Sequence, residues 1–250
     1  MPPELLDPVA YTWEEFRAWF GMKWRPGEHI AIIAPTGAGK TTFAGGILDL
    51  RKYVLAADPK GGDETLAGLN WRRITEWPGE RKMNTMLDDD ERHKRDSRYV
   101  VGPVVNRVED RAKLRDAIGA SLKGAHDMGG WTYYLDETQV AADRRMMNLS
   151  GEIDTLLVAA RSKGVSMVLS FQQPRWVTSA SLNQVTWLVT SYTRDRDVVD
   201  RLAEILGRPK PEIRGAVRGL DPFCWLIVGR DPRAPMVLTK PDKIAPKRAS

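Results

Sequence analysis

Several classes of site are excluded by what this sequence lacks. It contains one cysteine, Cys224, so no disulfide can form within the chain, as suits a reducing compartment. Three histidines, His29, His93 and His126, lie far apart and outside any Cys/His cluster, so a zinc site is unsupported. The longest apolar runs, such as FCWLIVG (223–229), are too short to span a bilayer, and the acidic, aromatic start is unlike a signal peptide. We therefore expect a cytoplasmic protein with no membrane segment.

Positively charged residues slightly outnumber negatively charged ones. The chain has 38 Lys and Arg residues against 33 Asp and Glu, a net charge of +5. This balance is compatible with a polyanionic partner but does not require one. The 250 residues, 42% of them hydrophobic, are enough for one α/β domain with a sizeable core.

Short apolar runs alternate with helical patterns along the chain. The predicted strands are 30–34, 51–58, 98–102, 131–137, 165–170 and 185–191. The predicted helices are 11–20, 40–50, 108–126, 152–161 and a segment from Val198 that ends before Gly207. Because the strands are almost continuously apolar, this alternation predicts a three-layer α/β fold with a mostly parallel sheet covered by helices on both faces. The runs 223–229 and 235–239 predict a short C-terminal β-hairpin.

Composition divides the chain into three parts. Residues 1–28 form an aromatic-rich arm with a helix, 29–239 form the main domain, and 240–250 form a basic tail. Within the main domain, residues 80–98 are densely charged and predict a solvated excursion from the core.

A glycine-rich segment joins the first strand of the main domain to the following helix. It reads APTGAGKTT (34–42), a P-loop with Ala34 in the first glycine position. Such a loop surrounds phosphate oxygens with backbone N–H groups, and the helix N-terminus adds favourable partial charge. We expect Lys40 to contact the β- and γ-phosphates of ATP and the Thr41 hydroxyl to bind Mg²⁺. The predicted nucleotide-binding residues are Thr36, Gly37, Ala38, Gly39, Lys40, Thr41 and Thr42.

Two carboxylates end a later strand, WTYYLDE (131–137). Beside a P-loop, Asp136 would bind Mg²⁺ and Glu137 would polarise a water molecule for attack on the γ-phosphate. The alternative is that two acidic residues merely end a strand at a solvated turn. The pairing with the P-loop favours ATP hydrolysis.

Two further segments indicate the class of P-loop protein more narrowly than the P-loop and the two carboxylates do. AADPKGGDE (56–64) ends the second strand, and LSFQQP (169–174) ends the strand after the two carboxylates, with AARSKGV (159–165) before it. Together with the P-loop, they make residues 29–207 resemble the FtsK/HerA superfamily of DNA-pumping ATPases, which includes chromosome translocases, conjugative coupling proteins and viral genome-packaging ATPases. With no membrane anchor, winged-helix extension or nuclease domain, the chain looks most like the packaging ATPases.

The resemblance implies roles for three more residues. Gln172 would contact the γ-phosphate or the attacking water. Arg161 would act as an arginine finger on the ATP of a neighbouring subunit, and Lys60 would contact DNA phosphates in a central channel. A strand cap, a surface ion pair and a solvated turn lysine are the respective alternatives. Rival arginine fingers are Arg144, Arg145, Arg194 and Arg196.

The resulting hypothesis is an ATP-hydrolysing motor, RecA/FtsK-like in fold, that translocates double-stranded DNA. It would form a homo-oligomeric ring and package a viral genome into a capsid, with a portal or vertex protein as a further partner, in the cytoplasm of an infected host cell. The alternatives are a plasmid, conjugative or segregation DNA translocase, a nucleotide or small-molecule kinase, and a nucleotide switch without motor activity.

Overall fold

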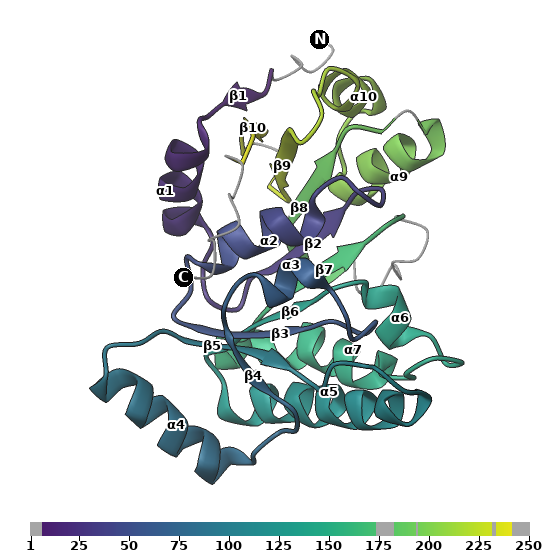
Figure 1. Cartoon of the computed structure of the whole chain (residues 1–250). Coiled ribbons are helices and arrows are strands. Elements are labelled where there is room, and N and C mark those ends of the chain that lie inside the picture. The colour runs from purple at the N-terminus through teal and green to yellow at the C-terminus, as the bar shows by residue number, and fades with distance from the viewer. Residues whose placement is uncertain (1–6, 174–182, 194, 232–233, 242–250) are drawn as a thin grey trace.

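One ten-stranded sheet organises the computed structural model, which describes residues 7–173, 183–193, 195–231 and 234–241 (Figure 1). Its strands are β1 (Val9–Ala10), β2 (His29–Ile33), β3 (Tyr53–Ala57), β4 (Arg72–Ile74), β5 (Ser97–Val101), β6 (Thr132–Leu135), β7 (Ser166–Phe171), β8 (Val185–Ser191), β9 (Trp225–Gly229) and β10 (Val237–Thr239). They lie in the order β1-β10-β9-β8-β2-β7-β6-β3-β5-β4. Strand β9 is antiparallel to β8 and β10, and every other neighbouring pair is parallel. The mostly parallel sheet and the antiparallel pairing of the last two strands are therefore confirmed.

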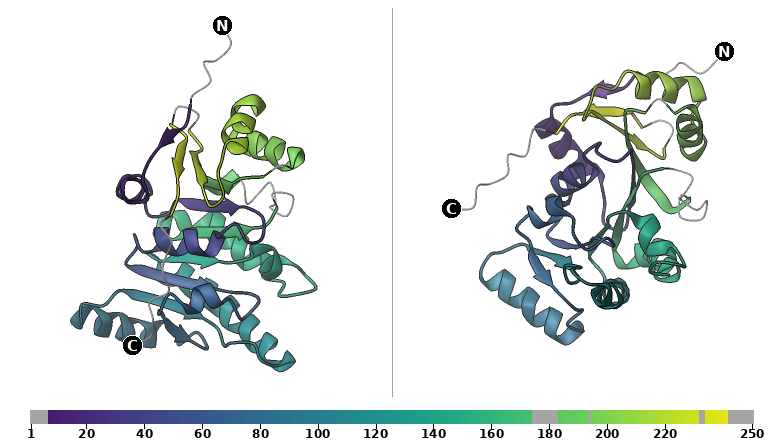
Figure 2. Two further views of the ribbon diagram at one scale, coloured as in Figure 1. Left: turned by 45° about the horizontal axis from the view of Figure 1, so that its top comes forward. Right: turned by 45° about the vertical axis from the view of Figure 1, so that its right-hand side comes forward.

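Helices cover both faces of the sheet (Figures 1 and 2). They are α1 (Trp13–Lys23), α2 (Lys40–Leu48), α3 (Glu64–Ala67), α4 (Glu80–Arg92), α5 (Val108–Met128), α6 (Thr138–Ala142), α7 (Ser150–Ala159), η1 (Ala160–Lys163), α9 (Arg196–Leu206) and α10 (Lys210–Arg218). Buried side chains of α1, α2 and α3 share one core cluster, and those of α5, α7, α9 and α10 share the other. The predicted three-layer arrangement is thus confirmed. Among the residues described, no helix is long and apolar enough to cross a membrane.

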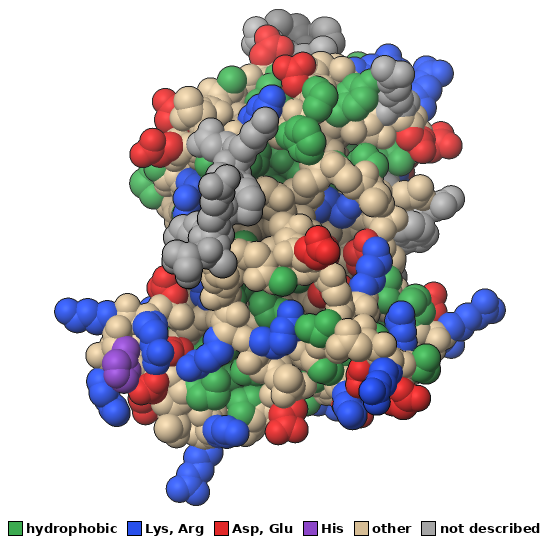
Figure 3. Space-filling view, viewed as in Figure 1, with side chains coloured by type: hydrophobic (Ala, Val, Ile, Leu, Met, Phe, Trp, Pro, Cys, Tyr) green, Lys and Arg blue, Asp and Glu red, His purple; other side chains and the backbone are tan. Residues whose placement is uncertain are grey.

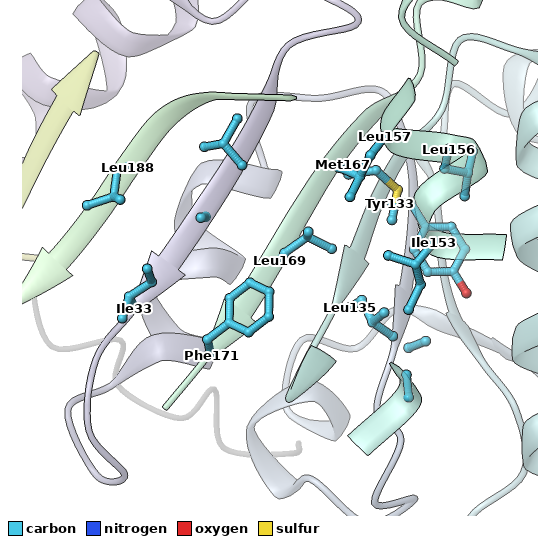
Figure 4. Close-up of a cluster of buried hydrophobic side chains, with 14 of the residues drawn as sticks. Ile33, Tyr133, Leu135, Ile153, Leu156, Leu157, Met167, Leu169, Phe171 and Leu188 are labelled. Atoms are coloured by element: carbon cyan, nitrogen blue, oxygen red, sulfur yellow. The ribbon is translucent and has the colours of Figure 1, made fainter. Parts of the chain in front are cut away.

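Strand side chains alternate between these two cores. In β2, Ile30 and Ile32 join the cluster under α1 and α2, whereas Ala31 and Ile33 join the cluster on the opposite face. Figure 4 shows part of the second cluster, where side chains of β6 and β7 pack against α7. Because both faces are buried, the strands must be apolar at successive positions, which is the pattern seen in the sequence.

The aromatic residues near the N-terminus are core residues. Thr12 and Glu15 form a capping box that starts α1. The Trp13 ring lies 5.6 Å from that of Phe43 on α2, and Phe16 and Phe20 are fully buried. Burial of these large rings attaches α1 to the helix that follows the P-loop.

The charged segment 80–98 contains a regular helix. Helix α4 lies at the sheet edge beside β4 and β5 (Figure 1), and most of its charged side chains face solvent. Met83 enters the core, and the buried Asp90 carboxylate receives hydrogen bonds from Tyr99 and Arg72. The segment therefore contains an amphipathic helix, with a charged side that faces solvent and another side that packs on the core.

His29 joins the start of β2 to its neighbours. Its Nε2 lies 3.1 Å from the Leu157 carbonyl oxygen, and its Nδ1 lies 3.0 Å from the Met167 backbone nitrogen, from which it accepts a hydrogen bond. The neutral ring satisfies both contacts, since Nε2–H can donate while Nδ1 accepts. Burial lowers the pKa of His29 from 6.5 to about 4.

This arrangement predicts a pH-dependent stability. Between about pH 6.5 and pH 4 the unfolded chain binds a proton at His29 that the folded chain does not. The free energy of unfolding should therefore be highest above pH 6.5 and fall by about 3 kcal/mol through this group as the pH approaches 4. Urea titrations across this range should show a smaller loss in His29→Gln, whose amide keeps a donor and an acceptor but does not titrate. Equal losses in both proteins would contradict the assignment.

Candidate active site

The P-loop connects β2 to α2 at the carboxyl edge of the sheet. Gly37 and Gly39 have φ angles of 80° and 87°, a left-handed conformation that a side chain would strain. Lys40 is buried, and its Nζ donates to the carbonyl oxygens of Ala34 at 3.0 Å and Pro35 at 3.1 Å. Burial lowers the pKa of Lys40, and the Asp136 carboxylate opposes that shift. The amine is thus held inside the loop that would surround the phosphates.

A hydroxyl and a carboxylate meet beside Lys40. Asp136 directly follows β6, and its Oδ2 lies 3.4 Å from the Thr41 hydroxyl. Its Oδ1 accepts a hydrogen bond of 2.8 Å from the buried Tyr134 hydroxyl, which orients the carboxylate. Burial raises the pKa of Asp136, and the hydrogen bond from Tyr134 opposes the rise.

These two oxygen donors fit Mg²⁺ bound together with a nucleotide. Mg²⁺ is usually held by one or two protein oxygens, with phosphate oxygens and water completing its coordination. Among the residues described, no group of three or more His, Cys, Asp or Glu side chains could hold a metal. Thr41 and Asp136 are therefore suited to a nucleotide-bound metal and not to a self-sufficient metal site.

Glu137 is the centre of a polar cluster. It is the N-cap residue that precedes α6 and has a φ of 44°, an unusual left-handed conformation for a residue with a side chain, costing about 1–2 kcal/mol. Its Oε1 accepts a hydrogen bond of 2.9 Å from Gln172 Nε2 and also pairs with the Lys60 ammonium group. Gln139 Nε2 lies 3.4 Å from Oε2. Gln172, predicted as a sensor, thus lies against the predicted catalytic carboxylate.

The loop after β3 is held by Asp58, which sequence reasoning did not single out. The Asp58 carboxylate accepts backbone hydrogen bonds from Lys60 at 2.8 Å, Gly62 at 2.6 Å and Asp63 at 2.7 Å. These bonds order the loop and bring Lys60 to Glu137. An aspartate followed by Pro-Lys-Gly-Gly was the available signal, because aspartate often caps its own turn. Tyr134 and Gln139 were also missed as partners of the two carboxylates.

The candidate arginine fingers lie at different places. Arg161 is exposed on η1, and its carbonyl oxygen would lie 2.7 Å from a Cβ atom added to Gly27, just before β2. It is therefore near the amino end of β2, away from the P-loop of its own chain.

The rival arginine fingers lie elsewhere. Arg196 begins α9, which follows the carboxyl end of β8. Arg144 and Arg145 are exposed after α6. Arg194, and Pro174 of the Gln-x-Pro motif, lie outside the described residues.

No protein-family model and no curated protein sequence matches the chain. Its fold is similar to the genome packaging NTPase B204 from Sulfolobus turreted icosahedral virus 2 in complex with AMPPCP, with a TM-score of 0.58 and 17% identity over 88% of this chain and 100% of that one. The DNA-packaging ATPase B204 from Sulfolobus Turreted Icosahedral Virus gives 0.57 and 16% over the same shares. VirB4 of Thermoanaerobacter pseudethanolicus gives 0.59 and 10% over 86% of this chain and 89% of that one. The chain therefore has the P-loop ATPase fold of these proteins, as its sequence predicted.

Proposed function

We propose that this chain is an ATPase that moves double-stranded DNA, and that it packages a viral genome into a capsid. The observation that carries the ATPase proposal is the contact between Gln172 and Glu137 beside the buried Lys40. A kinase must bind an acceptor molecule beside the γ-phosphate, whereas a hydrolase places a water there, which a carboxylate such as Glu137 can activate.

The geometry supports a separate role in hydrolysis for each of these side chains. Glu137 would accept the proton of the attacking water, and Gln172 would orient that water or the γ-phosphate. Lys40 would bind the β- and γ-phosphate oxygens together with the backbone N–H groups of the P-loop. Thr41 and Asp136 would hold Mg²⁺, which supplies positive charge to the phosphates when bound.

Two observations support DNA as the partner. The similar B204 proteins are named as genome packaging and DNA-packaging enzymes, and this chain covers the whole of their length. The net charge of +5 suits a polyanion. Lys and Arg side chains are interspersed with acidic ones over the face shown in Figure 3, so this face presents no single basic patch to DNA.

The proposed assembly is a closed ring around the DNA, docked on a portal or vertex protein of the capsid, in the cytoplasm of an infected host cell. An arginine from one subunit would reach the ATP of the next, where such a residue raises the rate of hydrolysis by about 10³–10⁵-fold. The family resemblance assigns this role to Arg161. Its position away from the P-loop of its own chain is compatible with action on a neighbouring subunit.

The motor proposal is tested by steady-state ATP hydrolysis with and without double-stranded DNA. We expect DNA to raise the release of free phosphate severalfold, and moderate salt to suppress the increase because the contacts are to phosphates. Hydrolysis that is indifferent to DNA at low salt, with the protein concentrated enough to assemble, would contradict the motor. Phosphate appearing on an acceptor molecule would favour a kinase.

A substitution of Lys60, measured in the same assay, tests one proposed contact with DNA. We propose that it contacts DNA phosphates, which requires its ammonium group to leave Glu137. Lys60→Ala should then reduce the stimulation by DNA while ATP binding stays unchanged. Lys113→Ala, which alters an exposed lysine on α5, serves as the matched control. Equal stimulation in the wild type and in Lys60→Ala would exclude this role.

A further inference from the structure

An exposed phenylalanine occupies a turn position that favours glycine. Residues 221–224 form a β-turn, closed by a hydrogen bond of 3.0 Å from the Cys224 backbone nitrogen to the Asp221 carbonyl oxygen. Pro222 takes the second position and Phe223 the third, with a φ of 65°. This is the pattern of a type II turn, whose third position requires a positive φ and is normally glycine. A bulky residue in this conformation is unusual enough to suggest a function.

Burial does not explain this choice of residue. Phe223 is 57% exposed, and among the described large apolar residues that are exposed it is the one aromatic. The backbone therefore holds a flat apolar ring at the surface in a conformation that the ring itself disfavours. Such an arrangement is expected where the ring serves a binding partner.

The ring lies against the P-loop. A Cβ atom added to Gly39 would lie 3.5 Å from Cδ1 of Phe223. The turn leads into β9, whose first residue, Trp225, packs its ring 4.8 Å from that of Phe43 on α2. The turn is thus anchored to the helix that completes the phosphate loop.

The strand order indicates which part of a nucleotide would meet this ring. Glu137 and Gln172, which would face the γ-phosphate, follow β6 and β7 on one side of β2. Strands β8 and β9 lie on the other side. A triphosphate with its γ end at Glu137 therefore extends through the P-loop toward β8 and β9, so that its base lies on the side of Phe223.

We propose that Phe223 is the platform on which the purine base of the bound nucleotide stacks. This inference rests on the proposed ATP site and names its base subsite. Stacking uses the flat face of the base, and adenine and guanine both present such a face. The platform therefore holds purine nucleoside triphosphates without selecting between ATP and GTP.

The test compares ATP with inorganic tripolyphosphate, which has the phosphates but no base. Their dissociation constants, and that of GTP, are measured by calorimetry on the wild type, Phe223→Gly and Phe223→Tyr. Glycine suits the left-handed turn, so Phe223→Gly should fold with an unchanged or higher Tm. We expect it to weaken ATP and GTP about 10- to 100-fold and to leave tripolyphosphate unchanged. Phe223→Tyr should bind all three as the wild type does.

Three results would overturn the platform. Unchanged ATP binding in Phe223→Gly would show that the base does not use the ring. An equal loss for ATP and tripolyphosphate would show that the turn shapes the phosphate loop instead. A wild type that binds neither ATP nor tripolyphosphate would overturn the nucleotide site itself, and the proposed function with it.

Discussion

Glu137→Gln is expected to lower ATP turnover by about 10²–10⁴-fold while ATP still binds. The glutamine amide has nearly the same shape as the carboxylate and keeps an oxygen that can accept the hydrogen bond from Gln172. Lys40 and the backbone of the P-loop are untouched, so the phosphates should still be held. The substitution removes the capacity to take a proton from water, together with the negative charge that pairs with Lys60.

Single-turnover hydrolysis and equilibrium ATP binding separate these two effects. Glu91→Gln is the matched control, because Glu91 is an exposed residue of α4 paired with Lys52. Its turnover should equal that of the wild type. If Glu137→Gln retained turnover within about tenfold of the wild type, the general-base role would have to be given to another group.

Lys40→Met is expected to lower kcat/KM for ATP by about 10²–10⁴-fold. Lys40 would supply charged hydrogen bonds to the β- and γ-phosphates, each worth about 1.5–3 kcal/mol. Methionine fills the buried space of the lysine stem but donates no hydrogen bond. Because the native amine carries a buried charge, its removal should leave the fold intact or make it more stable.

The loss should appear in binding as well as in turnover, in contrast to Glu137→Gln. Steady-state kinetics and thermal unfolding with and without ATP measure both. Lys52→Met removes an exposed lysine and is the matched control. A Tm that rises with ATP equally in Lys40→Met and in the wild type would contradict the predicted phosphate contact.

The P-loop and the strand of the two carboxylates were predictable because their signals are local. A strand, a glycine-rich turn and a helix N-terminus within residues 30–50 suffice to form a phosphate loop. Near-continuous apolar runs also predict a parallel sheet buried on both faces, which the structure confirms.

Some elements were missed because they are short or have weak patterns. Strand β1 has two residues and β4 has three, too few to show alternation. Helix α4 is so charged that its few apolar residues did not stand out, and helix α10 includes Pro211 and Gly215. In each case packing against the rest of the fold stabilises a segment with a weak local preference.

Residue chemistry was readable from the chain, but the partners of each group were not. Lys60 follows β3, Glu137 follows β6 and Gln172 follows β7, and these three strands are neighbours in the sheet. That order brings the three side chains together at one edge, although Lys60 and Gln172 lie 112 positions apart in the sequence. Similarly, Phe223 reaches the P-loop because β9 pairs antiparallel with β8. Amphipathic periodicity and loop motifs depend on near neighbours in sequence and therefore identify elements and their chemistry. Strand order depends on packing the whole core, so the cluster around Glu137 and the position of Phe223 emerge only from the tertiary structure.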